Sequence, residues 1–359
     1  MKDKLLQGTK RFLSKLFIDG LSGMALGLFS TLIVGTILAQ IGAYIPGAVG
    51  EYIVRIGTIA KAAMGVGIGC GVAIKYKSSP LLTISAAVCG MAGAYAARLL
   101  SGELLSGAIV TLNSPGEPLG AFIAAFVGIE IGALIAGKTK IDIILTPIVT
   151  ILAGGAAGLL VGPPVSRFMA WLGGIINFGA EQQPILMGII VAVAMGIFLT
   201  LPISSAAIGV ALSLSGIAAG AATVGCCANM IGFAVISYRE NKMGGLLAQG
   251  LGTSMLQMPN IVKKPIIWLP VILSSAILGP ISAVLGLTGN AVGSGMGTAG
   301  LVGPIMTFSV MTEAGSPVWQ VLLLILLMLF ILPAALSLLF SEIMRKLGWI
   351  KLGDMKLDA

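Results

Sequence analysis

Histidine is absent from this sequence of 359 residues, and charged residues make up only 9% of it. A soluble domain carries about 25% charged residues, so this scarcity excludes an ordinary soluble globular protein. Without histidine, carboxylates such as Glu130 and Glu313 are the only plausible general bases. Cysteines are few and lie inside apolar runs without metal-type spacing, so they indicate small packing residues, with no metal site, disulfide or cofactor. They are Cys70, Cys89, Cys226 and Cys227.

Apolar residues and glycine dominate what is present. The sequence is 57% hydrophobic and contains 51 glycines, and its mean hydropathy is +1.06. These values predict an all-α, polytopic integral membrane protein. The net charge of +8 does not indicate a nucleic-acid partner, because the basic residues fall in short loops between apolar runs, as membrane orientation requires.

Ten apolar runs have about the length of a membrane span, which needs roughly 20 residues. They cover residues 20–41, 52–74, 80–100, 118–137, 142–162, 184–201, 203–222, 224–238, 266–286 and 317–340. With the N-terminus inside, all 21 Lys and Arg residues fall on the cytoplasmic side except Arg55, Lys61, Arg98 and Arg167. This asymmetry predicts one transmembrane domain over 1–359 with both termini cytoplasmic, an interfacial helix over 1–18 and a tail over 341–359.

Four stretches do not fit simple spanning helices. Residues 101–117 are short and polar, which predicts an outer hairpin or loop, and residues 163–183 are typical of an amphipathic helix on the outer surface. Residues 243–260 mix glycines with amides and hydroxyls, and residues 288–304 are rich in glycine. Both predict re-entrant segments, because non-helical backbone survives at membrane depth only inside protein or beside a watery cavity. For the glycine-rich stretch, ordinary glycine-mediated helix packing is the alternative.

A weak internal repeat is also visible at a shift of about 124 residues, and repeats are common in transporters. The matches are mostly glycine, so duplication and chance stay equal alternatives. The shift brings Gly120, Gly128, Lys140, Gly155 and Gly162 onto Gly244, Gly252, Lys264, Gly279 and Gly286.

Ionisable residues inside predicted spans are functional candidates, because burying one costs about 2.5–3.5 kcal/mol or more at the membrane centre. Glu130 lies near the middle of the fourth span, and Lys61 lies within reach of it in the second. They are candidates for ion or proton coupling, with a structural ion pair as the alternative. Glu313 follows the second glycine-rich stretch and is either a substrate ligand or an interfacial surface carboxylate.

Three long motifs resemble the integral-membrane family labelled phosphotransferase-system enzyme IIC type 2, which includes the regulator of perfringolysin O production. The motifs are TVGCCANMIGFAVISYREN, GGLLAQGLGTSMLQMPN and GSGMGTAGLVGP. The resemblance implies a sugar-permease-like component of the bacterial cell (inner) membrane, a homodimer, with substrate held between spanning helices and re-entrant segments. No histidine or exposed cysteine resembles the phosphoryl carriers of IIA and IIB domains, so any phosphoryl transfer is expected from separate IIA and IIB chains.

Two functions remain open at this point. The first is a permease for a small polar, sugar-like solute, driven through the phosphotransferase partners or by an ion gradient; the second is a membrane sensor that binds a ligand without net transport. Buried amides need partners, so we expect a solute to supply them. The candidate solute ligands are Asn229, Gln249, Thr253, Ser254, Gln257, Asn260, Asn290, Ser294 and Glu313.

Overall fold

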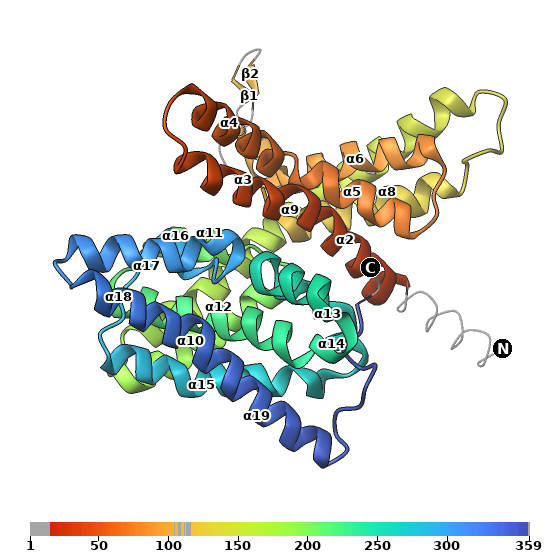
Figure 1. Cartoon of the computed structure of the whole chain (residues 1–359). Helices are drawn as coiled ribbons and strands as arrows, with labels where there is room; N and C mark the ends of the chain where they lie inside the picture. The colour runs from red at the N-terminus through yellow and green to blue at the C-terminus, as the bar shows by residue number, and fades with distance from the viewer. Residues whose placement is uncertain (1–14, 104, 107–108, 111, 113–115, 358–359) are drawn as a thin grey trace. The chain divides into compact units, whose positions relative to one another are not determined.

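A computed structural model describes residues 15–103, 105–106, 109–110, 112 and 116–357, and it is helical apart from one very short strand pair (Figure 1). The chain divides into two compact units, Met1–Phe168 and Met169–Ala359. The boundary between them falls within one long helix, α9 (Asp142–Ala180). The all-helical prediction is therefore confirmed.

Unit 1 contains a first continuous helix, Lys15–Ala43, followed by a bent pair and a series of shorter helices. Its elements are η1 (Lys15–Gly20), α2 (Leu21–Leu28), η2 (Phe29–Ile33), α3 (Val34–Ala43), α4 (Ala48–Ala62), α5 (Met64–Lys75), α6 (Pro80–Ala94), α7 (Ala96–Leu100), β1 (Leu105–Ser106), β2 (Ile109–Val110), α8 (Pro118–Ala133) and the start of α9.

Local sequence explains where these helices begin and how closely they pack. Ser79 accepts a hydrogen bond from the backbone N–H of Leu82, and Pro80 follows it in the first turn, so α6 starts there. Between α4 and α5 the chain bends by 54°. Glycine allows close helix contacts: a methyl group on Gly57 would lie 2.7 Å from the backbone nitrogen of Ala39. Much of the glycine content of unit 1 therefore serves helix packing.

Unit 2 contains several helices that are interrupted by non-helical backbone. Its elements after α9 are α10 (Pro184–Thr200), α11 (Ser205–Ala211), α12 (Gly216–Ile236), α13 (Tyr238–Leu247), η3 (Ala248–Gly252), η4 (Ser254–Gln257), α14 (Met258–Lys263), η5 (Pro265–Trp268), α15 (Leu269–Val284), α16 (Ala291–Ser294), η6 (Ala299–Leu301), α17 (Val302–Glu313), α18 (Val318–Ile325), η7 (Leu326–Ile331) and α19 (Leu332–Lys346).

Helix α12 is the centre of unit 2, and most of its residues are buried inside the protein. Its small residues let neighbouring backbones approach: a side chain at Gly225 would overlap the backbone of Ala192 on α10. Val224 and Cys227 of α12 pack in an apolar core with Leu278 of α15 and Met328 of η7. Polar groups on α12 are therefore removed from lipid and bond within the unit.

The number of spans is only partly settled. Within the described residues, five helices are long and apolar enough to cross a membrane, or six if the bent pair α4–α5 is one span, and three apolar helices are shorter: Pro80–Ala94, Pro118–Ala133 and Pro184–Thr200. The count of ten stays a prediction. Its seventh and eighth members, 203–222 and 224–238, are wrong as drawn, because α12 runs unbroken through their junction and only the short α11 precedes it.

Other predictions on unusual stretches have mixed outcomes. Within 101–117, Leu105–Ser106 pairs antiparallel with Ile109–Val110, which is the predicted hairpin. The separate outer helix over 163–183 is instead the second half of α9 as far as residue 180. Most of the predicted interfacial helix over 1–18 lies outside the described residues. The duplication stays a prediction, and the segments it pairs differ: α8 is a regular helix, whereas residues 244–257 are broken.

Candidate functional site

The polar stretch 243–260 forms a broken, buried segment. Lys242 has a φ of 51° inside α13, and Thr253 is extended between the π-helical η3 and the 3₁₀-helical η4. The hydroxyl of Thr253 accepts a hydrogen bond from the backbone N–H of Met255, which starts η4. Gln249, Ser254 and Gln257 are fully buried. The segment has the irregular, protein-enclosed backbone that the sequence predicted, and its re-entry into a membrane remains a prediction.

The second glycine-rich stretch is broken in a different way. Asn290 caps α16 by accepting from the backbone N–H of Gly293. Gly297, Gly300 and Leu301 all have φ between 53° and 59°, in the left-handed region that favours glycine. Leu301 is unusual there, because a branched side chain makes that backbone costly. Such conformations concentrate at functional sites.

The two broken segments meet beside α12. The Thr298 hydroxyl donates to the carbonyl oxygen of Gly250 at 2.5 Å and lies 3.5 Å from the sulfur of Met230 on α12. The Ser205 hydroxyl, at the start of α11, donates to the carbonyl oxygen of Gly295 at 2.7 Å. We call the contact of η3, Thr298 and α12 the segment junction. It brings together the Gly250 carbonyl of the first broken stretch and the Thr298 hydroxyl of the second inside unit 2.

Asn229 lies on α12 and is saturated by protein groups. Its Oδ1 accepts from Thr200 Oγ1 at 3.3 Å and from Trp268 Nε1 at 3.1 Å. Its Nδ2 donates to the Gly225 carbonyl at 3.1 Å and to Ser275 Oγ at 3.2 Å. Sequence reasoning missed these partners, since no local signal links residues that only tertiary packing brings together.

Gln249, Gln257 and Asn260 form an amide chain. Gln257 Nε2 donates to Gln249 Oε1, and Asn260 Nδ2 donates to Gln257 Oε1, both at 2.9 Å. Gln249 Nε2 donates to Ser237 Oγ at 2.9 Å and to the Gly245 carbonyl at 3.0 Å. The expectation that these amides depend on a solute for partners is therefore wrong, although binding by them stays a prediction.

The remaining candidate ligands have separate surroundings. Ser254 is within 2.8 Å of the Thr200 hydroxyl, which places it beside Asn229. Ser294 donates back to the Ala291 carbonyl within α16. Glu313 is exposed at the end of α17 and accepts from Ser309 at 2.6 Å. Its surroundings are those of a surface carboxylate, the alternative that the sequence left open.

Glu130 lies on α8 in unit 1 and pairs with Lys15 at the start of η1. The sequence suggested Lys61 as the partner of Glu130. Lys61 is at the end of α4, and the carboxylate of Glu130 pairs with Lys15 instead. The Lys15 ammonium also lies 4.6 Å from the centroid of the Tyr76 ring, and the Tyr76 hydroxyl donates to the Lys15 carbonyl at 2.8 Å. The carboxylate is about one-third exposed, and its role in coupling stays a prediction.

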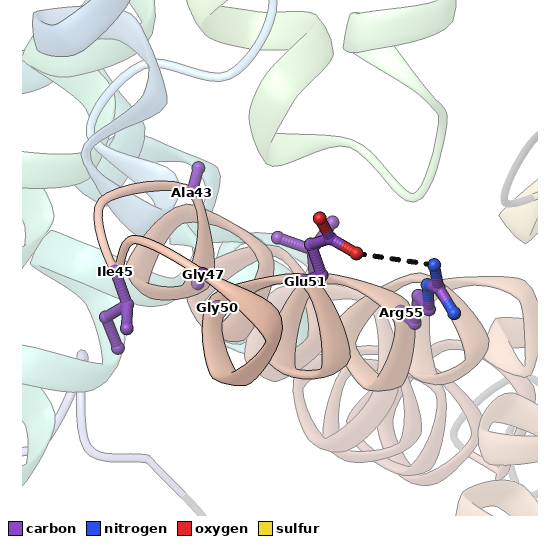
Figure 2. Close-up of a pocket in the computed structure, with 8 residues that line it drawn as sticks. Ala43, Ile45, Gly47, Gly50, Glu51 and Arg55 are labelled. Atoms are coloured by element: carbon purple, nitrogen blue, oxygen red, sulfur yellow. Dashed lines mark hydrogen bonds and ion pairs between the residues drawn. The ribbon is translucent and has the colours of Figure 1, made fainter.

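A surface pocket of about 360 Å³ lies elsewhere in unit 1, at the α3–α4 turn (Figure 2). Figure 2 shows Glu51 and Arg55 along one wall, joined by an exposed ion pair of 3.5 Å. None of the predicted ligands lines this pocket. Within the described part of the chain, no group of three His, Cys, Asp or Glu residues could hold a metal ion.

Comparison with known proteins gives one finding. A family model described as "Phosphotransferase system, EIIC" matches residues 18–357, across both units. No curated protein and no solved structure matches the chain significantly.

Proposed function

Because the chain belongs to the phosphotransferase system EIIC family, we propose that it is the membrane permease component for one small, polar, sugar-like solute. The proposal includes a bacterial cell membrane location, cytoplasmic termini, a homodimer and solute contact by residues of unit 2. Family membership supports a sugar substrate and phosphotransferase partners.

The observation that carries the proposal is the segment junction. Transporters bind solutes where discontinuous helices expose backbone groups near the midplane, because regular helices have no spare backbone donors or acceptors there. In unit 2, two such segments converge through Thr298 and Gly250. A carbonyl oxygen has two lone pairs, so the Gly250 carbonyl keeps acceptor capacity beyond the Thr298 hydrogen bond. We propose that the solute hydroxyls bind there, with Thr253 and Ser254 beside it in sequence.

The energy source is proposed to be phosphoryl transfer by separate IIA and IIB chains. The sequence has no histidine to carry a phosphoryl group, and burial keeps Cys89, Cys226 and Cys227 away from a soluble donor. Coupling to an ion gradient through Glu130 is the second candidate, favoured by the partly exposed carboxylate paired with Lys15.

The test is uptake of a panel of labelled sugars into vesicles that contain the purified protein. We expect accumulation only when phosphoenolpyruvate and the phosphotransferase partners are supplied, with the sugar recovered as its phosphate. Thr298→Val keeps side-chain volume but removes the bond to Gly250, so uptake should fall at least about tenfold, the equivalent of 1.4 kcal/mol. Thr36→Val in unit 1, which loses only a bond to Leu32 of its own helix, is the matched control.

Three outcomes would contradict parts of this proposal. Accumulation that follows a proton or sodium gradient without the partner chains would replace phosphoryl coupling by ion coupling. Saturable binding with no uptake under either condition would instead support the sensor alternative. Equal uptake by the Thr298→Val and Thr36→Val variants would remove the segment junction from the solute path.

A further inference from the structure

The last described segment of the chain, Ile350–Leu357, is a strap that makes a turn at residues 352–355 and folds back onto unit 2. In Figure 1 the chain leaves the end of α19 and returns past α14 and α13. Ile350 and Met355 are buried at 2% and 0% exposure, whereas Leu352 between them is 72% exposed. The strap is thus attached by alternate apolar anchors and not by a continuous apolar face.

Side chains of unit 2 bind the backbone of the strap. Glu240 accepts from the N–H groups of Gly353 at 3.0 Å and Met355 at 2.9 Å, one with each carboxylate oxygen. Asn241 donates to the Met355 carbonyl and accepts from the Leu357 N–H, both at 2.8 Å. The turn pairs the N–H groups of Asp354 and Lys356 with carbonyls inside the strap. Glu240 and Asn241 supply the partners for the N–H groups of Gly353, Met355 and Leu357.

The amide chain continues the same pattern. Gln257 Nε2 donates to the Met355 carbonyl, and Asn260 Nδ2 donates to the Lys356 carbonyl, both at 2.9 Å. We call Glu240, Asn241, Gln257 and Asn260, together with Lys264, the strap groove. All of them except Lys264 come from two of the motifs that carry the family resemblance. Three of its side chains are amides that hydrogen-bond to the backbone of the strap. Recognition through the backbone does not require a particular side chain at each position of the peptide.

Specificity for this strap comes from two side chains. Lys264 Nζ lies 2.6 Å from Asp354 Oδ2, and Met355 fills a site from which solvent is excluded. A further ion pair holds the base of the groove, since Arg345 on α19 contacts Glu240 at 3.4 Å and donates to the Ile236 carbonyl at 3.1 Å. Backbone bonds with one acidic and one apolar anchor define a ligand class: a short, turn-forming peptide with an acidic residue directly before a methionine.

We propose that the strap groove is a peptide-binding site, that its occupant is the chain's own Ile350–Leu357, and that the docked strap is a releasable closure that slows solute movement through unit 2. One feature supports release: the anchoring ion pair is partly open to solvent, with side-chain exposures of 32% for Lys264 and 21% for Asp354. A second feature supports the effect on solute movement, because Gln257 of the groove belongs to the broken segment 243–260 and donates to Gln249 within it. The effect on solute movement rests on the proposed permease function, whereas docking does not.

Docking is tested with a chain that ends at Gly348 and a fluorescent peptide of residues 349–357. We expect saturable binding, weakened at least about tenfold in a Met355→Ala peptide, because that peptide loses a fully buried side chain. A Leu352→Ala peptide is the matched control and should bind within about twofold of the parent, because Leu352 is exposed. Absence of saturable binding by a shortened chain that still melts cooperatively would overturn the proposal.

Hydrogen exchange on the full chain gives a measurement that does not depend on the shortened chain. The N–H groups of Met355 and Leu357 are protected only while the strap is docked. We expect them to exchange faster than the amides of α12, and Asp354→Asn should accelerate them at least about fivefold while α12 is unchanged. If the strap and α12 exchange together, at the rate of global unfolding, then the strap is a fixed part of the fold and the proposal is wrong.

The regulatory effect is measured as the initial rate of uptake in vesicles. Asp354→Asn should raise that rate at least about threefold, and added peptide 349–357 should lower it again. An unchanged or lower rate, with strap exchange accelerated, would overturn the closure. Absence of uptake in the parent chain, with exchange as expected, would contradict the permease function and leave docking supported.

Discussion

Replacement of Asn229 by alanine is the sharpest test of what the buried amides do. The change removes four hydrogen bonds, to Thr200, Gly225, Trp268 and Ser275. Interhelical hydrogen bonds in membranes contribute about 0.6 kcal/mol each on average, so their loss costs about 2 kcal/mol. The indole N–H of Trp268 also loses its acceptor, and an unsatisfied buried donor costs about 1–3 kcal/mol.

The expected destabilisation is therefore about 3–5 kcal/mol. For a unit of this size each kcal/mol shifts the melting temperature by about 2–4 °C, so Asn229→Ala should lower it by roughly 10 °C. Cys227→Ala is the matched control, because Cys227 is equally buried on the same helix. It should cost about 1 kcal/mol for the small cavity.

The assay is the thermal melt of detergent-purified protein, with and without the solute that uptake identifies. If the amide is structural, the melting temperature falls and the solute still raises it by the same increment. A melting temperature within about 2 °C of the parent, together with loss of the solute-induced increment, would refute this reasoning. Asn229 would then belong to the solute site.

Three further predictions concern charged residues. Glu130→Gln should leave phosphoenolpyruvate-driven uptake unchanged within about twofold, and loss of gradient-driven uptake would instead assign it to coupling. Burial raises the pKa of the Asp354 carboxyl, but hydrogen bonds from Lys264 and a backbone N–H, with nearby positive charge, lower it below its ordinary value. The contribution of this carboxylate to strap docking is therefore complete above the ordinary carboxyl pKa of about 3.9 and is lost as the pH falls through the lowered value. Exchange of the strap amides relative to those of α12, measured against pH, should accelerate over that range. In a cysteine-free background, external labelling should reach a cysteine at position 103 and not one at 264, and the reverse would overturn the topology.

Periodicity and composition predicted a helix well where it coincides with one apolar run of the sequence. They placed helix boundaries wrongly where one helix continues across two predicted runs, or where a helix is interrupted inside the protein. The boundary between the predicted spans 203–222 and 224–238 was placed wrongly, because glycine and alanine are tolerated throughout α12 by close packing against α10 and α15. The real break lies earlier, between α11 and α12, at Ser213 and Gly216, which both have positive φ.

The candidate site was predictable in its segments but not in its partners. Glycines among amides and hydroxyls identified both broken stretches, because such sequences cannot form lipid-facing helices. The contact between Thr298 and Gly250 was not predictable, since it depends on where α12 holds the two stretches. The strap groove was missed for the same reason: the residues of each hydrogen-bonded pair lie about 100 positions apart in sequence, such as Gln257 with Met355.

Among the candidate solute ligands, hydrogen-bonding capacity that the protein leaves unused favours Thr253 over Asn229 and the amide chain. Asn229 has four protein partners, and the amide chain ends on the strap, so a solute that bound these groups would have to displace existing bonds. Thr253 is different, because its hydroxyl accepts from the Met255 N–H, and a hydroxyl can also donate one proton. It is buried three residues after Gly250, whose carbonyl carries the bond from Thr298. A solute hydroxyl that accepts from Thr253 and donates to the Gly250 carbonyl would satisfy both groups without breaking the hydrogen bonds that the protein already makes. For this reason we place solute binding at the segment junction and regulation at the strap groove.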